Sequence, residues 1–231
     1  MSLKPDKAKF SNPLIKYSVC FDFDNTITCF DVLDDLIERF SIDKKWMKFE
    51  DLWKQGKIGS RECLKKQLAS VRITRKELSD YLSSVKVDRN FKKILELLKK
   101  KGIRPSILSD NFSFIIKQIL RKNHIRPIRL WSNKLKFKKN RIFPYFPHVN
   151  VSCFRCGHCK KNNLLKHHFG YKMFYIGDGL SDVCPAEYAD VVFAKGSLLK
   201  HFRKKKKQCI AIKDLGGVYS YLKGALLDGT H

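Results

Sequence analysis

The stretch Tyr17-Ser-Val-Cys-Phe-Asp-Phe-Asp-Asn-Thr26 decides the fold and indicates its chemistry. Its first five residues are mostly apolar and are typical of a short buried strand. Two carboxylates, Asp22 and Asp24, follow directly. An isolated Asp-x-Asp is often a turn or a helix cap, but the strand before it and Thr26 after it favour another interpretation. Two crowded carboxylates repel each other and lose hydration, and a hard divalent cation relieves both costs. The stretch therefore predicts a strand that ends at a metal and phosphate site.

Further apolar stretches of strand length recur along the chain, and helical spacing fills the gaps between them. The predicted strands are Pro105–Leu108, Ile128–Trp131, Lys172–Ile176, Ala189–Phe193 and Gln208–Ile212, and the predicted helical stretches are 91–98, 112–120 and 219–227. The segment 131–143 predicts a β-hairpin that turns at Lys139-Asn140. Strands that alternate with helices predict an α/β fold, a doubly wound parallel sheet covered on both faces. Its ligand is expected beyond the carboxyl ends of the strands.

One region interrupts this alternation. Between residues 30 and 86 the apolar positions follow only helical spacing. We expect an all-helical cap at 30–86, inserted into a catalytic core of 17–29 and 87–231 that follows a flexible arm at 1–16. Because the insertion lies between the candidate residues Asp22 and Ser109, we expect it to act as a lid over the site.

The charge of the chain is unusual. Its 231 residues carry a net charge of +26, from 48 Lys and Arg against 22 Asp and Glu. This charge implies attraction to anions, such as phosphorylated metabolites, nucleic acid or acidic membrane surfaces, although a lysine-rich solvated surface explains it as well. No apolar run reaches the roughly 18 residues that span a bilayer, and the start of the chain has no signal-peptide pattern. We therefore expect a cytoplasmic protein, and the sequence does not predict its oligomeric state.

The eight cysteines do not form the pattern of a disulfide framework. Five of them are predicted to be small buried hydrophobic residues: Cys20, Cys29, Cys63, Cys184 and Cys209. The other three, Cys153, Cys156 and Cys159, form Cys-x-x-Cys-x-x-Cys and are candidates for a zinc site, with His148, His158 or His167 as fourth ligand. A structural zinc site normally uses two separated pairs, and the chain has no second Cys-x-x-Cys, so metal binding by these cysteines stays an open alternative.

Four motifs, in order from residue 19 onward, resemble those of the haloacid-dehalogenase phosphatases. Asp22-Phe-Asp-Asn-Thr26 is similar to the first motif, Asp-x-Asp-x-Thr or Val, and Ser109 follows a predicted strand as in the second. Lys160 stands where the lysine of the third motif is expected. Gly177-Asp-Gly-Leu-Ser-Asp182 matches the fourth, Gly-Asp-Gly-x-x-Asp. One such motif is weak, whereas four in the family's order are specific.

The resemblance implies a catalytic role for each matching residue. Asp22 would be the nucleophile that forms an aspartyl-phosphate. Asp24 would protonate the leaving alcohol and then activate the hydrolytic water. Ser109, Asp110 and Lys160 would bind the phosphate and spread its charge in the transition state.

The resemblance also implies a Mg²⁺ ion. Asp22, Asp178 and the backbone carbonyl of Asp24 would bind it. Three neighbours would support this arrangement: Thr26, Gly179 and Asp182. Asn25 replaces the commoner glycine of the first motif, and we expect the change to be tolerated because this position contributes mainly backbone.

The cysteine-rich segment before Lys160, together with Phe146-Pro-His148, resembles one subgroup of these phosphatases. This subgroup contains the methionine-salvage phosphatases and the phosphocholine and phosphoethanolamine phosphatases, and phosphoserine phosphatase is a more distant relative with the same cap. The resemblance implies a small phosphorylated metabolite as substrate, first a hydroxy-keto-methylthiopentenyl phosphate. Phosphoserine, phosphocholine, phosphoethanolamine and pyridoxal phosphate are the alternatives.

Three residues of the predicted cap are candidates for substrate selectivity. Asp31 lies nine residues after Asp22, where phosphoserine phosphatases carry an acid that contacts the substrate amine, and a helix N-cap explains it equally well. Arg61 and Glu62 belong to a segment that resembles the cap of the salvage-type enzymes. These two residues either face the substrate or lie on a solvated helix surface.

A non-enzymatic alternative is a basic nucleic-acid-binding protein on the same fold. Against it stands the complete set of motif residues, which a pure binding module has no physical reason to keep. The sequence therefore favours a phosphatase.

Overall fold

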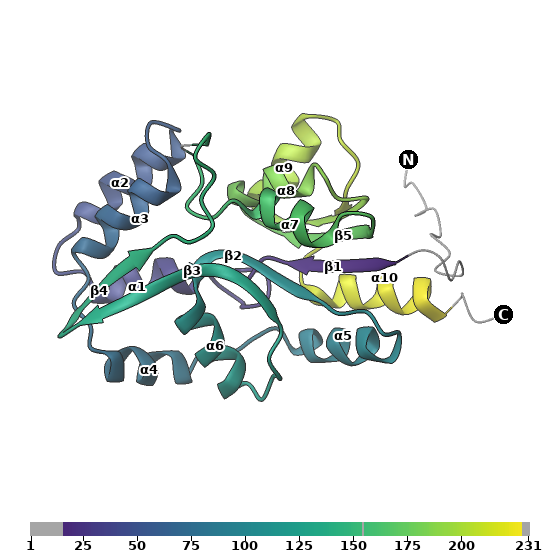
Figure 1. Ribbon diagram of the computed structural model, residues 1–231, viewed down its shortest axis with the longest axis horizontal. Coiled ribbons are helices and arrows are strands. Elements are labelled where there is room, and N and C mark those ends of the chain that lie inside the picture. Colours follow the sequence, from purple (N-terminus) through teal and green to yellow (C-terminus); the bar gives the residue numbers. More distant parts are fainter. Residues whose placement is uncertain (1–15, 154, 228–231) are drawn as a thin grey trace.

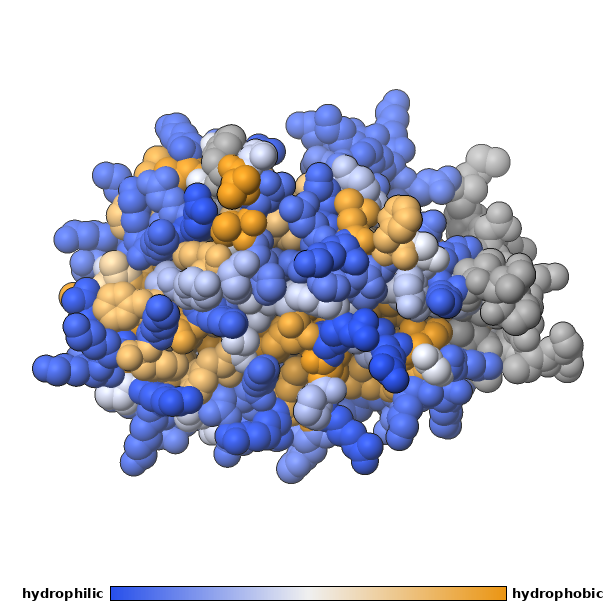
Figure 2. Space-filling view, viewed as in Figure 1, coloured by the Kyte–Doolittle hydropathy of each residue, from blue (hydrophilic) through white to orange (hydrophobic). Residues whose placement is uncertain are grey.

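The computed structural model describes residues 16–153 and 155–227. Of the arm predicted at 1–16, residues 1–15 lie outside this described part. Hydrophilic side chains cover most of the face shown in Figure 2. Among the described helices, none combines the length and the apolar character that a membrane span requires.

A seven-stranded sheet forms the centre of the molecule (Figure 1). Its strands are β1 (Tyr17–Phe21), β2 (Ser106–Phe112), β3 (Arg129–Lys138), β4 (Arg141–Tyr145), β5 (Lys172–Gly177), β6 (Val191–Ala194) and β7 (Ile210–Ala211). They lie in the order β4-β3-β2-β1-β5-β6-β7, and all neighbours pair in parallel except the β3–β4 hairpin. The predicted α/β fold with a doubly wound parallel sheet is therefore confirmed, and so is the hairpin. The strand order reverses around β1, which is the position where such sheets bind ligands.

Helices cover both faces of the sheet. In Figure 1, α5 (Arg89–Lys100), α6 (Ser113–Lys122) and α10 (Leu215–Leu227) lie on one face, and α7 (Lys160–His168), α8 (Val183–Ala186) and α9 (Gly196–Lys204) lie on the other. A short 3-10 helix, η1 (Leu180–Asp182), precedes α8. Successive strand residues point to opposite faces, so Phe21 packs in the larger core and Cys20 in the smaller one.

Four helices lie between β1 and α5 along the chain: α1 (Val32–Phe40), α2 (Lys45–Lys54), α3 (Ser60–Ala69) and α4 (Arg75–Ser83). The chain enters and leaves this segment at one place, where Thr28 and Val87 form an isolated bridge. The backbone N–H of Ser60, at the start of α3, donates to the carbonyl of Arg155 at 2.8 Å. The two ends of the helical insertion are thus joined to each other, and its helix α3 is tied to the loop before α7.

The predicted burial of the scattered cysteines is correct only in part. Cys20 and Cys63 are buried, and Cys209 is half-buried. Cys29 and Cys184 are exposed, so the prediction is wrong for these two. Both lie outside the strands, in a bend and in the short helix α8, where apolar neighbours in sequence do not determine the direction of a side chain.

Candidate active site

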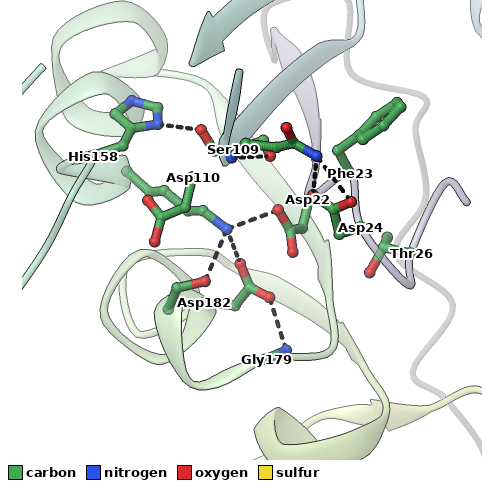
Figure 3. A network of polar contacts seen from close by, with 12 residues as sticks. Asp22, Phe23, Asp24, Thr26, Ser109, Asp110, His158, Gly179 and Asp182 are labelled. Atoms are coloured by element: carbon green, nitrogen blue, oxygen red, sulfur yellow. Dashed lines mark hydrogen bonds and ion pairs between the residues drawn. The ribbon is translucent and has the colours of Figure 1, made fainter. Parts of the chain in front are cut away.

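The predicted motif residues meet at the carboxyl ends of three neighbouring strands (Figure 3). Asp22 follows the central strand β1, Ser109 lies in β2, and Asp178 follows β5. Lys160 begins α7 beside them. Parallel strands deliver their carboxyl ends to one edge of a sheet, so residues distant in sequence become neighbours at this edge.

Lys160 is the central cation of the site. Its ammonium donates to Asp22 Oδ1 and to Asp182 Oδ1, both at 2.7 Å, and to Ser181 Oγ at 3.1 Å. Burial lowers the pKa of Lys160, but the carboxylates of Asp182 and Asp22 outweigh burial and raise this pKa overall. The side chain is 2% exposed and stays charged because it is paired.

Asp182 supports the site from below. Its Oδ1 accepts from Lys160 and from the Tyr175 hydroxyl at 2.7 Å, and its Oδ2 accepts from the N–H groups of Asp178 and Gly179 at 3.0 Å. Burial raises the pKa of Asp182, but the Lys160 ammonium outweighs burial, so this pKa is lowered overall. A Cβ at Gly177 would lie 2.6 Å from Asp182 Oδ2, which explains the first glycine of this motif.

Three carboxylates could hold a metal ion: Asp22, Asp178 and Asp182 each offer an oxygen, and these oxygens lie within 4.8 Å of one another. Burial and the neighbouring charge of Asp182 raise the pKa values of both Asp22 and Asp178. Carboxylates that crowd in this way are the oxygen donors that a hard divalent cation prefers. Among the described residues, Asp182 already accepts four hydrogen bonds, whereas Asp178 accepts two and Asp22 accepts one, so Asp22 and Asp178 are the better metal ligands.

Asn25 and Thr26 orient Asp178. The Asn25 amide donates to Asp178 Oδ2 at 2.8 Å, and the Thr26 hydroxyl donates to Asp178 Oδ1 at 3.1 Å. Asn25 has a φ of +48°, a conformation that glycine adopts freely and asparagine tolerates. The expectation that this position contributes mainly backbone is therefore incomplete, because the side chain contributes a hydrogen bond as well.

Asp24 is held by Asn111, a residue for which the sequence predicts no role. The Asn111 amide donates to both carboxyl oxygens of Asp24, at 2.8 and 3.0 Å, and the N–H of Val32 donates to Oδ1 at 3.1 Å. Burial, followed by the charge of Asp31, raises the pKa of Asp24 well above its usual range. Asn111 lies two residues after Ser109, in the motif that was recognised, but its contact with Asp24 depends on the fold.

His158 holds Ser109 in place, and it too was missed in this role. Its Nδ1 lies 2.9 Å from the carbonyl oxygen of Ser109, and its Nε2 lies 2.7 Å from the Asn163 amide nitrogen. Burial lowers the pKa of His158 to about 3, so the ring is neutral. A proton on Nδ1 satisfies both contacts. In the sequence His158 stands out only as a candidate zinc ligand, but in the structure both of its ring nitrogens already have partners.

A cavity of about 130 Å³ opens above these residues. Its charged lining is strongly acidic: one lysine, Lys160, faces six carboxyl groups, those of Asp22, Asp24, Asp31, Asp34, Glu50 and Asp110. The insertion contributes the remaining wall through α1, α2 and α3, including the ring of Trp53. A chain with a net charge of +26 thus surrounds this cavity with acids.

Two further acids of the cavity, Asp34 and Asp110, also have raised pKa values. Asp34 lines the cavity, and desolvation by the cavity wall together with the charges of Asp31 and Glu50 raises its pKa to about 7. Burial raises the pKa of Asp110 to about 6. Asp110 Oδ1 is buried without a hydrogen-bond partner among the described residues, and Asp110 lines the cavity.

The three predicted selectivity residues lie in different places. Asp31 lines the cavity and also caps α1, because its Oδ1 accepts from the N–H of Asp34 at 2.9 Å. Arg61 and Glu62 do not line the cavity, and Glu62 forms an exposed ion pair with Lys66. The face of α3 that lines the cavity consists of Ser60, Cys63, Leu64 and Gln67, a helical spacing that leaves out positions 61 and 62.

The cysteine triplet does not form a cluster of metal ligands. In the part of the chain that the structure describes, the group of three ligand atoms within 4.8 Å is that of Asp22, Asp178 and Asp182. Cys153 Sγ and Cys156 Sγ lie 3.8 Å apart. Cys159 is buried at the start of α7.

Sequence comparison finds a family match and several relatives. The sequence model of the family described as Putative Phosphatase matches residues 17–212. The chain is 25% identical over 211 residues to the 2-hydroxy-3-keto-5-methylthiopentenyl-1-phosphate phosphatase of Exiguobacterium sp., covering 89% of this chain and 97% of that protein. The protein of the same name from Geobacillus kaustophilus is 29% identical, covering 78% of this chain and 83% of the relative.

Structural comparison finds the same architecture in solved structures. A substrate-bound phosphoserine phosphatase complex superposes with a TM-score of 0.68 at 18% identity, covering 89% of this chain and 98% of the other. A HAD family hydrolase from Salmonella enterica serovar Typhi gives a TM-score of 0.72 at 16% identity, covering 91% and 72%. At these identities the likeness establishes the fold.

Proposed function

The chain belongs to the Putative Phosphatase family and is a phosphatase of the haloacid-dehalogenase type, and on this premise we propose that it hydrolyses a small phosphomonoester through an aspartyl-phosphate on Asp22. The observation that carries the proposal is the position of Asp22, which lines the cavity, bonds to Lys160 at 2.7 Å and lies beside Asp178. A carboxylate so placed can meet an anionic phosphate only where cations offset the repulsion, and here these would be the Lys160 ammonium and a bound metal ion.

In the first step, a carboxylate oxygen of Asp22 forms a bond to phosphorus while the bond from phosphorus to the ester oxygen breaks. Asp24 gives its proton to the departing oxygen, a role that its raised pKa favours. Lys160 and Ser109 donate to the non-bridging phosphoryl oxygens. Asp110 belongs to the same set when it is protonated, because its carboxylate would repel a phosphate.

In the second step, Asp24 takes a proton from a water molecule, whose oxygen bonds to phosphorus as the bond to Asp22 breaks. Inorganic phosphate leaves, and Asp22 is regenerated as a carboxylate. Asn111 keeps Asp24 in one orientation for both proton transfers. His158 and Asn163 keep the backbone of Ser109 in place through their own hydrogen bonds.

Mg²⁺ is the proposed cofactor, since the donor set of buried carboxylate oxygens fits a hard cation. Asp22, Asp178 and the carbonyl of Asp24 would hold it, and when bound it neutralises charge on the phosphate and on the carboxylates. Asn25 and Thr26 orient Asp178 for this purpose. Gly179 and the lysine-bound Asp182 fix the backbone beneath it.

The segment 30–86 is proposed to be the cap of a core formed by 17–29 and 87–231. It supplies Asp31, Asp34, Glu50 and Trp53 to the cavity, so substrate selectivity would depend on it. A cavity of about 130 Å³ favours a small leaving group over a polymer. A cytoplasmic location is part of the same proposal.

Two substrate classes are candidates. The names of the relatives favour 2-hydroxy-3-keto-5-methylthiopentenyl-1-phosphate, whose organic part carries no cation. The acidic lining of the cavity favours a second class, phosphomonoesters with an ammonium group, such as phosphoethanolamine, phosphocholine or phosphoserine. Asp31, Asp34 and Glu50 would attract this group, and the ring of Trp53 would add a cation–π contact.

The test is phosphate release from a panel of these esters and pyridoxal phosphate, with and without Mg²⁺. We expect Mg²⁺-dependent turnover that Asp22→Asn lowers by about 10³-fold or more, because the nucleophile is lost. Asp51→Asn, on an exposed face of α2, is the matched control and should leave turnover unchanged. Turnover that survives in Asp22→Asn would rule out the aspartyl-phosphate, and the best substrate decides between the two classes.

A further inference from the structure

A second, larger cavity lies at the opposite edge of the sheet from the catalytic residues. It has a volume of about 820 Å³ and is bordered by α5 and by the segments that follow α5 and α6 and lead into β2 and β3. In the lower part of Figure 2, where Figure 1 draws α5 and α6, hydrophobic surface is bordered by hydrophilic side chains. We name this cavity the amino-edge groove, because it lies where β2 and β3 begin.

The groove is built from a repeated segment. Gly102-Ile-Arg-Pro105 follows α5 and His124-Ile-Arg-Pro127 follows α6. Both helices end in the same way. The isoleucine N–H donates back to Leu98 or Leu120 at 2.9 Å, and the residue before it has a positive φ, +67° at Gly102 and +54° at His124. These are Schellman endings, in which the apolar residue after the turn folds back on its helix.

The repeat places two arginines, Arg104 and Arg126, in the lining of the same groove. In each copy the isoleucine is partly or fully buried and the arginine is exposed. The proline that follows restricts the arginine to an extended backbone, directed away from the helix that has just ended. β2 and β3 are adjacent and parallel, and they pair from Ser106 and Arg129 onward, so Arg104 and Arg126 precede neighbouring strands.

The groove has an excess of positive charge. Five cations line it, Lys92, Lys99, Arg104, Arg126 and Arg129, against a single carboxylate, Glu96. Within residues 16–153 and 155–227, no ion pair or side-chain hydrogen bond involves any of the five cations. Lys99 lies in the last turn of α5 and offsets the dipole of that helix. The arginines lie beyond the helices, so the dipoles do not account for them.

The walls between these cations are apolar. Leu95, Ile103, Ile125 and Ile128 line the groove together with Pro105 and Pro127. One guanidinium group can donate two parallel hydrogen bonds to two oxygens of a phosphate, and an apolar wall accommodates a flat organic ring. A volume of 820 Å³ is within the range of small-molecule sites.

We propose that the amino-edge groove is a second ligand site, which binds an organic polyphosphate of the nucleoside triphosphate type. Arg104 and Arg126 bind the phosphates, and the isoleucine and proline side chains contact the organic ring. This site is separate from the catalytic cavity, with which it shares no lining residue.

The test is calorimetric titration of ATP into full-length Asp22→Asn protein without Mg²⁺, so that no phosphate is released. We expect ATP to bind, and we expect Arg104→Ala with Arg126→Ala to weaken binding by about tenfold or more, since charge-assisted hydrogen bonds are lost. Lys204→Ala with Lys205→Ala is the matched control. It removes the same charge from an exposed site at the end of α9 and should change the affinity by less than about twofold.

Two further measurements identify the ligand chemistry. Arg104→Lys with Arg126→Lys keeps the charge and removes the guanidinium geometry, so its affinity should lie between those of wild type and the alanine pair. Inorganic tripolyphosphate should bind more weakly than ATP, because it lacks the ring. The proposal is overturned by any of four results: ATP does not bind, both alanine pairs weaken it equally, tripolyphosphate binds as tightly, or only a nucleic-acid strand binds.

Discussion

The catalytic cavity and the amino-edge groove lie at opposite edges of one sheet and carry opposite charge. At the carboxyl edge, Lys160 is buried and bonded to two carboxylates, in a cavity that is otherwise acidic. At the amino edge, five cations line one groove with no ion pair to a described carboxylate. The charge that gives the chain its net value of +26 is therefore not evenly distributed over the molecule.

The difference separates two kinds of cation, one buried and paired and the other exposed and unpaired among the described residues. A buried cation is tolerated only because it is paired with fixed carboxylates. Removing either the cation or a carboxylate leaves a buried charge without a partner, which destabilises the fold. An exposed, unpaired cation costs little to remove and can gain a partner only from outside the chain. Substitutions at the carboxyl edge should therefore change stability and turnover, whereas substitutions at the amino edge should change ligand affinity.

The largest expected effect on stability comes from Lys160→Ala. It leaves Asp22 and Asp182 without their shared cation, and we expect the free energy of unfolding to fall by about 3 kcal/mol or more. Turnover should fall by about 10²-fold or more, because a donor to the phosphoryl oxygens is lost. Denaturant titration and phosphate release measure the two quantities.

Two controls sharpen the comparison between the edges. Lys166→Ala removes an exposed lysine from the same helix α7 and should change the stability by less than about 0.5 kcal/mol. The alanine pair at Arg104 and Arg126 should be as stable as wild type or more so, because it relieves repulsion between like charges. If the arginine pair proves as destabilising as Lys160→Ala, the contrast between paired and unpaired cations is wrong.

Much of the fold followed from sequence because each local pattern has one physical outcome. The alternation of strands and helices predicted the parallel sheet, and Gly102 ended the helix at 91–98 with a positive φ. The four motifs predicted that Asp22, Ser109, Lys160 and Asp178 belong to one site. They lie together because the carboxyl ends of parallel strands meet at one edge of the sheet.

The missed contacts depend on the direction of side chains after folding. Asn111 and His158 lie inside stretches that were examined, but their bonds to Asp24 and Ser109 span 87 and 49 residues. The acidity of the cavity was missed for the same reason, because Asp34 and Glu50 come from different helices of the insertion. The sequence suggested a basic site, because it gives only the net charge of the whole chain and not the charge around the cavity.

The next effect concerns the acids of the catalytic cavity and depends on pH. The pKa of Asp34 is raised to about 7, so this carboxyl group is mostly protonated at pH 6 and ionised at pH 8. If the substrate carries an ammonium group, its KM should fall by about three- to tenfold as the pH rises from 6 to 8, because a partner charge appears. Steady-state kinetics with phosphoethanolamine measure this change.

Two variants isolate the contribution of Asp34. Asp34→Asn should remove most of the pH dependence of KM, while Asp51→Asn, on the exposed surface of the neighbouring helix α2, should keep it. A KM that is flat in the wild type, or equally steep in Asp34→Asn, means that the acidic lining does not attract the substrate. The methylthiopentenyl phosphate serves as the substrate without a cation, and its KM should not fall with rising pH.

The smallest effect tests how far the pairing at the catalytic edge extends. Asn25→Gly keeps the left-handed backbone at this position and removes the hydrogen bond to Asp178, so we expect the Mg²⁺ concentration for half-maximal activity to rise by about two- to tenfold. Asn25→Ala removes the same bond and adds backbone strain of about 1 kcal/mol, which should appear as lower stability in denaturant titration. If the two variants need the same Mg²⁺ as wild type, Asn25 acts through its backbone alone. If both variants lose the same Mg²⁺ affinity and only the alanine variant is less stable, the side-chain hydrogen bond supports Mg²⁺ binding and the backbone conformation affects stability alone. The hydrogen-bonded groups that support the metal site would then include Asn25 as well as the metal ligands.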